Sequence, residues 1–181
     1  MADTPVRWLL LIHSLPPQPA YLRVKTSRQL QSLGAVALKN SIYVLPSSDE
    51  AREDFQWMLR QIESGGGEAS VVQAEFVEGF TDDEVRGLFI TARNADYEKL
   101  AGDLHSHLKS LPPSLEDGSR GEVETQLIRF RKRLEEIQDL DYFDAPGRAQ
   151  VEEALSTLEA RLIPASVSRS EATRLQLQDV Q

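Results

Sequence analysis

Apolar runs and amphipathic stretches divide the start of the chain into a strand and a helix. Residues 7–14 contain the continuous apolar run of residues 8–12, and a pair of prolines follows them. A run without alternation predicts a strand that is buried on both faces. Residues 19–33 repeat apolar side chains at helical spacing, and Gly34 follows where a C-terminal helix cap belongs.

Two more strands, a second helix and a fourth strand follow. Residues 35–38 and 41–45 predict a hairpin whose turn contains Asn40, a residue type that tolerates a positive φ. Residues 49–64 have an apolar helical face, and residues 68–76 read as a strand. The order β-α-β-β-α-β predicts a ferredoxin-like α+β domain with both helices on one sheet face.

Helical patterns fill the rest of the chain. The sequence Thr81-Asp82-Asp83-Glu84 is a capping box that predicts the start of a long helix, which Pro112-Pro113 ends. Residues 114–121 predict a mobile loop. Residues 122–140 and 148–163 each carry a heptad seam and predict an antiparallel helical hairpin. The inner stripe of the long helix is predicted at Val85, Leu88, Ala92, Leu100, Leu104 and Leu108.

These patterns predict three parts. Residues 1–80 form the ferredoxin-like domain, residues 81–164 form a helical extension packed on it, and residues 165–181 form a flexible tail. A chain of 181 residues can fold around such a core without disulfides, and it contains no cysteine. The longest apolar run is too short to span a membrane and lacks the flanks of a signal peptide, so we expect a cytoplasmic protein with no membrane partner.

Charge is distributed unevenly along the chain. The net charge is −9, but residues 1–46 carry +4 and residues 47–181 carry −13. An acidic protein is not a general nucleic-acid binder, so a basic contact must be local. The basic side chains that we expect to contact DNA are Arg23, Lys25, Arg28 and Lys39.

An apolar and aromatic set accompanies these cations. Tyr21 and Val24 lie opposite the core stripe of the first helix, and Trp57 points away from the apolar face of the second. These three are candidate partner-binding residues. For Trp57 we favour burial by the later helices over contact with another chain, because a lone exposed tryptophan is uncommon. A solvated charged face is the ordinary alternative for the first helix.

The histidines and the later basic cluster give weaker signals. His105 and His107 lie two apart on a helix, so they do not share a face for one metal, and we expect them to be exposed. His13 ends the first strand and is either a partly buried histidine with satisfied hydrogen bonds, which we favour, or part of an anion pocket with Lys39. The cluster of Arg129, Arg131, Lys132 and Arg133 favours local ion pairs with nearby glutamates, with oxyanion capture as the alternative.

No catalytic motif accompanies these residues. The chain lacks a nucleophile-elbow serine, a phosphate-binding glycine loop and a His-Glu-x-x-His motif. We therefore expect no enzyme, no metal and no cofactor.

Five segments of the chain carry a family resemblance: WLLLIHSLPPQPAYLRVK (8–25), QSLGAVALKNSIYVLP (31–46), EAREDFQW (50–57), GGGEAS (65–70) and, more weakly, DYFDAPG (141–147). These segments resemble the N-terminal domain of ChrB proteins, a family associated with bacterial chromate resistance. The resemblance implies a part in chromate-responsive transcriptional regulation. Full-length members join this domain to a second one, so sensing that resides there is not carried over to a chain that ends at residue 181.

The strand, helix and hairpin at the start of the chain also resemble the C-terminal domain of PaaX-type repressors and the small CRISPR adaptation nuclease. The nuclease places a carboxylate at the end of its first strand, where this chain has His13, so nuclease activity is rejected. The fold shared with these proteins implies a homodimer through the sheet. The leading hypothesis is a non-enzymatic regulatory domain that contacts promoter DNA. The alternatives are a protein-interaction or dimerisation module without DNA binding and, more weakly, a site for an oxyanion effector such as chromate.

Overall fold

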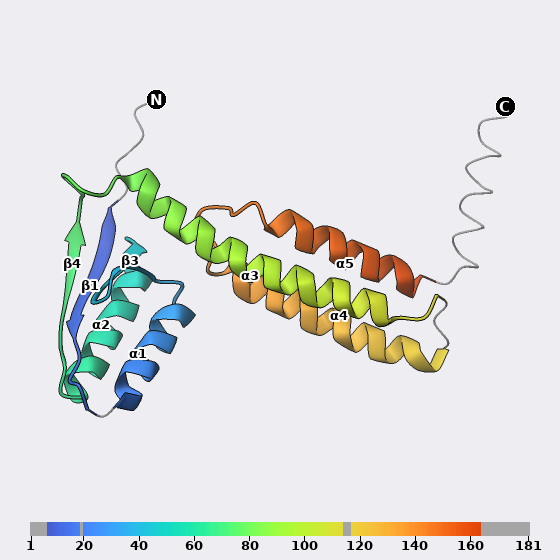
Figure 1. The fold of residues 1–181 in the computed structure, drawn as a ribbon, viewed down its shortest axis with the longest axis horizontal. Helices are drawn as coiled ribbons and strands as arrows, with labels where there is room; N and C mark the ends of the chain where they lie inside the picture. Colours follow the sequence, from blue (N-terminus) through green and yellow to red (C-terminus); the bar gives the residue numbers. More distant parts are fainter. Residues whose placement is uncertain (1–6, 19, 114–116, 164–181) are drawn as a thin grey trace. The chain divides into compact units, whose positions relative to one another are not determined.

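A computed structural model describes residues 7–18, 20–113 and 117–163 (Figure 1). The predicted tail therefore lies outside the described residues. In chain order the elements are β1 (Trp8–Ser14), α1 (Ala20–Ser32), β2 (Val36–Lys39), β3 (Ile42–Pro46), α2 (Asp49–Ser64), β4 (Glu68–Ala74), α3 (Asp82–Ser110), α4 (Asp117–Gln138) and α5 (Arg148–Leu162). No helix among the described residues is long and apolar enough to cross a membrane.

The four strands form one antiparallel sheet, so the fold is of the mixed α+β class that the sequence predicts. The strand order is β2-β3-β1-β4, with β1 hydrogen-bonded between β3 and β4. Leu9 lies opposite Leu45, and Leu10 lies opposite both Val44 and Val72. Both helices that connect the strands, α1 and α2, lie on the same side of the sheet (Figure 1).

The two faces of the sheet differ in burial. Leu9 and Leu11 on one face of β1 are buried. Ile12 lies on the opposite face, as Val72 does, and these side chains are 40% and 38% exposed. The prediction that β1 is covered on both faces is therefore wrong at Ile12.

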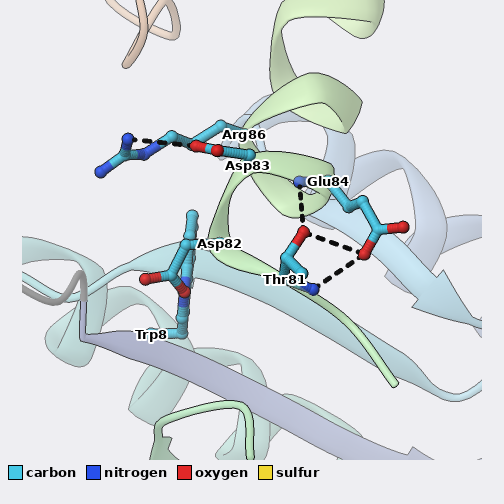
Figure 2. A network of polar contacts seen from close by, with 6 residues as sticks. All are labelled: Trp8, Thr81, Asp82, Asp83, Glu84 and Arg86. Carbon is cyan, nitrogen blue, oxygen red and sulfur yellow. Dashed lines mark hydrogen bonds and ion pairs between the residues drawn. The ribbon is translucent and has the colours of Figure 1, made fainter. Parts of the chain in front are cut away.

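An aromatic cluster fills the Trp8 end of the sheet. The indole of Trp8 stacks on Phe89 with ring centroids 6.0 Å apart, and Phe76 and Phe143 contact it at 6.5 and 6.1 Å. Its Nε1 donates a hydrogen bond of 2.7 Å to Asp82 Oδ1 at the start of α3 (Figure 2). A buried indole needs such an acceptor, and this bond fixes where α3 begins relative to β1.

The buried stripe of α3 differs from the predicted one. Leu88, predicted to face inward, is 37% exposed. The buried side chains are Val85, Phe89, Arg93, Tyr97, Leu100, Ala101 and Leu104. The first four recur every four residues, so large aromatic rings rather than the nearest leucine take the inner positions of the helix.

Local signals for helix ends are confirmed. The Thr81 hydroxyl accepts a hydrogen bond from the Glu84 N–H while the Glu84 carboxylate accepts one from the Thr81 N–H, which is the predicted capping box (Figure 2). Ser48 caps α2 by accepting from the Ala51 N–H at 3.0 Å. Gly34 follows α1 with a φ of 70°.

The hairpin turn differs from its prediction. Asn40 does not adopt a positive φ, since Asp144 is the non-glycine residue with this conformation in the described ranges. The pairing of β2 and β3 instead shifts register between Ala37 and Lys39.

The chain divides into two compact units within α3. The first comprises residues 1–93 and 140–145, and the second comprises residues 94–139 and 146–181. The first unit thus includes the start of α3 and a short return segment.

The second unit contains the predicted helical hairpin. The seam residues Val123, Leu127, Phe130 and Leu134 of α4 are buried, as are Val151, Leu155 and Leu158 of α5. Arg131 pairs with Glu159 at 2.7 Å across the two helices.

The start of α4 differs from its prediction. It begins at Asp117 rather than at 122, so residues 117–121 are helical and not loop. Each glycine in this stretch costs about 1 kcal/mol of helix propensity, but extending an existing helix adds a hydrogen bond without a new nucleation step.

Candidate functional site

Helix α1 carries a concentrated positive charge. Its sequence, AYLRVKTSRQLQS, contains three cations and no carboxylate. Leu22, Thr26 and Leu30 are buried and hold the helix on the sheet. Arg23, Lys25 and Arg28 are all exposed, in a protein whose net charge is −9.

The structure brings Lys25 and Arg28 together with the predicted partner-binding residues. Lys25 Nζ donates a hydrogen bond of 3.1 Å to Gln61 Oε1, which joins α1 to α2. Trp57 lies one helical turn before Gln61. The outer face of α1 and α2, as we call it, consists of Tyr21, Val24, Lys25, Arg28, Trp57 and Gln61.

Apolar groups on this outer face remain open to solvent. Tyr21 is 68% exposed, Val24 is 51% exposed and Trp57 is 42% exposed. Exposed aromatic side chains flanked by cations are typical of binding surfaces rather than of a solvated helix face.

Arg23 and Lys39 lie elsewhere. Arg23 lines a cavity with Thr26 and Ser27, on a side of α1 that Lys25 does not share. Lys39 ends β2 and precedes Asn40, which also lines that cavity. The four cations predicted to contact DNA therefore fall into two groups.

Helix α2 has the opposite charge. Its sequence contains five carboxylates and two guanidinium groups. Burial raises the pKa of Asp54, and the neighbouring carboxylates of Glu50 and Glu53 raise it further. The basic helix α1 therefore lies beside an acidic helix (Figure 1).

His13 is partly buried but not satisfied, which corrects one half of its preferred interpretation. Both ring nitrogens are shielded from solvent, and neither has a hydrogen-bond partner among the described residues. The ring stacks on Tyr43, with centroids 5.7 Å apart and an interplanar angle of 19°. Burial lowers the pKa of His13, so the imidazole is neutral at pH 7.

A cavity of about 440 Å³ adjoins this histidine. It lies between the end of β1, helix α1 and the β2–β3 turn, and Arg23 rather than Lys39 supplies its charge. The side chains of Ser27, Asn40 and Ser41 were not candidates in the sequence. The antiparallel pairing of the hairpin with β1 is what brings the turn beside His13.

The later histidines form no metal site. The described residues contain no group of three potential ligands. His105 is exposed as predicted, but His107 is not: its ring packs against Phe130 at 5.7 Å, and its Nε2 is buried.

The later basic cluster forms ion pairs with other helices. Arg133 pairs with Asp103 of α3 at 2.8 Å, and Arg131 pairs with Glu159 of α5. Lys132 pairs within its own helix, with Glu136 at 3.9 Å. The predicted local pairing is confirmed for Lys132, but it is wrong for Arg131 and Arg133, whose partners lie on other helices.

Comparisons with known proteins agree on one family. The family model for the N-terminal part of Protein ChrB matches residues 23–166. Protein ChrB of Cupriavidus metallidurans is 27% identical over 151 residues, which cover 80% of this chain and 44% of that relative. The chain thus spans less than half the length of the curated relative that it matches.

Proposed function

Because the chain belongs to the family of ChrB N-terminal domains, we propose that it is a non-enzymatic regulatory domain that takes part in the transcriptional control of chromate resistance by contacting DNA. The observation that carries this proposal is the charge of α1, which has three exposed cations and no carboxylate in an acidic protein. A few exposed cations on one helix can contact phosphates even though the protein as a whole is negatively charged.

Lys25 and Arg28 are the phosphate contacts that the geometry supports best. Both are on the outer face of α1 and α2, whereas Arg23 lines the cavity beside His13. Contacts to phosphates position a protein on DNA but do not read its sequence. We therefore assign α1 a positioning role and leave base recognition to other elements.

A salt titration of DNA binding tests this assignment. The double variant Lys25→Gln/Arg28→Gln should bind more weakly and lower the slope of log affinity against log salt by about 1.8, at about 0.9 per lost phosphate contact. Lys99→Gln/Lys109→Gln removes the same charge from the exposed surface of α3 and serves as the control. An unchanged slope in the first double variant, or an equal change in the control, would refute the contact through α1.

Charge complementarity favours a second candidate, self-association through the same outer face. Helix α1 is basic, helix α2 is acidic, and exposed Trp57 and Tyr21 lie among these charges. In a two-fold dimer, the basic α1 of one copy can face the acidic α2 of the other, and the symmetry then pairs both sets of charges at once. Aromatic residues at the centre of such an interface contribute most of its affinity.

Sedimentation of the purified protein without DNA separates the candidates. Self-association predicts a dimer that Trp57→Ala dissociates, and Ile128→Ala, at an exposed apolar position on α4, serves as the control. A monomer at every concentration would exclude the second candidate and leave the first intact.

We also propose that the first unit has the ferredoxin-like arrangement. Its support is the antiparallel order β2-β3-β1-β4 with α1 and α2 on one side of the sheet (Figure 1). Nuclear Overhauser effects between Leu10 and both Val44 and Val72 test the central position of β1. Their absence would contradict this order.

A further inference from the structure

We propose that the cavity beside His13 binds a small hydroxylated organic anion. The cavity of about 440 Å³ is lined by the end of β1, one side of α1 and the β2–β3 turn. This site lies away from the outer face of α1 and α2, so the inference goes beyond the proposed DNA contact.

The size of the cavity indicates an organic molecule rather than a simple ion. Its volume, about 440 Å³, is many times the roughly 30 Å³ that one water occupies. Sites for small organic molecules begin at about 300 Å³. An inorganic oxyanion would leave most of the cavity to solvent.

The charge of the lining indicates an anion. Arg23 supplies a guanidinium group, and none of the residues that line the cavity is a carboxylate. A guanidinium forms paired hydrogen bonds with carboxylate or phosphate oxygens. This charge is placed on the cavity side of α1, whereas Lys25 bonds to Gln61.

The neutral groups of the lining indicate hydroxyls on the ligand. Ser27, Asn40 and Ser41 supply hydroxyl and amide groups to the wall, and such groups both donate and accept hydrogen bonds, as a ligand hydroxyl does. The ring of His13 also lines the cavity, but its two nitrogens are shielded from solvent and serve as no contact for the ligand.

The histidine is held in place before any ligand arrives. Its ring stacks on Tyr43, and its backbone N–H donates a hydrogen bond of 2.9 Å to the Ser41 carbonyl oxygen. A fixed ring loses little conformational entropy on binding.

Nuclear magnetic resonance of the His13 ring gives a direct test. The probe is glycerol 3-phosphate, and its two halves, glycerol and inorganic phosphate, are titrated separately at matched ionic strength. We assign the His13 signals by their loss in His13→Gln. Glycerol 3-phosphate should shift them saturably at millimolar concentration, and each half should bind at least about tenfold more weakly.

Two variants on the same helix localise the site. Arg23→Gln should lower the affinity for glycerol 3-phosphate about tenfold or more, because it removes a charge-assisted hydrogen bond. Arg28→Gln removes an equal charge from the outer face and should leave the titration unchanged. A dispersed amide spectrum checks that each variant is folded.

Three results would overturn the inference. They are the absence of any saturable shift, an equal response to inorganic phosphate alone, and equal effects of Arg23→Gln and Arg28→Gln. The first would mean that water fills the cavity, the second that the site takes a simple oxyanion, and the third that the response reports general charge. Loss of DNA binding in Lys25→Gln/Arg28→Gln does not bear on these results.

Discussion

The hydroxyl of Tyr142 donates a hydrogen bond of 3.0 Å to the carbonyl oxygen of Leu33, which follows α1. The two residues are separated by 109 positions in the sequence. The ring of Tyr142 also packs edge-on against Phe89, with centroids 5.8 Å apart. Tyr142 thereby satisfies a carbonyl at the end of the helix that carries the candidate site.

Tyr142→Phe should lower the free energy of unfolding by about 0.5–1 kcal/mol, because the Leu33 carbonyl loses its protein donor. Burial raises the pKa of Tyr142 above 10.0, and the carboxylates of Glu50 and Asp54 raise it further. The bond therefore contributes fully below pH 10 and is lost as the pH rises through the folded-state pKa. Denaturant unfolding at neutral and alkaline pH measures both effects. Tyr21→Phe, at an exposed tyrosine, is the control and should change neither quantity.

Thr81→Ala should destabilise the start of α3 by about 1 kcal/mol, since it removes the N-cap hydroxyl that Figure 2 shows. The hydrogen bonds from the backbone and hydroxyl of Thr81 lower the pKa of Glu84. The contribution of Glu84 is therefore present above pH 4.5 and is lost as the pH falls through its folded-state pKa. Amide hydrogen exchange of the first turn of α3 measures this change. Thr91→Ala, within the same helix, should not loosen that turn, and equal effects of the two substitutions would contradict the capping role.

His13 should make the protein less stable in acid. Its folded-state pKa lies below 6.5 because burial disfavours the charged ring, so the unfolded chain takes up the proton first as the pH falls. Stability from the neutral ring is thus present above pH 6.5 and declines as the pH falls toward the folded-state pKa. His13→Gln should flatten this part of the stability profile in denaturant titrations. His105→Gln, at an exposed histidine, should not, and a profile that both variants leave unchanged would speak against the buried ring.

The two tryptophans should differ in their access to a quencher. Trp8 is fully buried, whereas Trp57 is 42% exposed. Acrylamide should therefore quench mainly Trp57, and Trp57→Phe should leave a fluorescence signal that acrylamide barely affects. Binding of a partner to the outer face should protect Trp57 in the wild type. Strong quenching in the Trp57→Phe variant would show that Trp8 is not buried.

Local features of this fold could be predicted from the sequence. Helix α2 has the predicted bounds of 49–64. The Thr81–Glu84 box could be identified as a cap, because capping depends on residues three positions apart. Burial of the α4 and α5 seams followed from heptad spacing for the same reason.

Features that depend on segments far apart in the chain could not be predicted from the sequence. The cavity beside His13 exists because strand pairing brings the β2–β3 turn to the end of β1. The position of Phe89 against Trp8 depends on where α3 starts relative to the sheet. Neither relationship is encoded in the spacing of neighbouring residues.

Helix geometry alone separates two of the cations that are predicted to contact DNA. Arg23 and Lys25 are two residues apart, and residues two apart on a helix lie on different faces. The same rule separates His105 from His107. In the structure, Arg23 lines the cavity and Lys25 bonds to Gln61.

The return of residues 140–145 to the first unit limits how the protein can be shortened. A fragment that stops after β4 or at Arg93 would lack Tyr142 and Phe143, and with them the donor to Leu33 and a ring against Trp8. No single cut of the chain yields the first unit intact. A shortened protein that keeps α1 and its cavity must therefore retain both segments of the first unit.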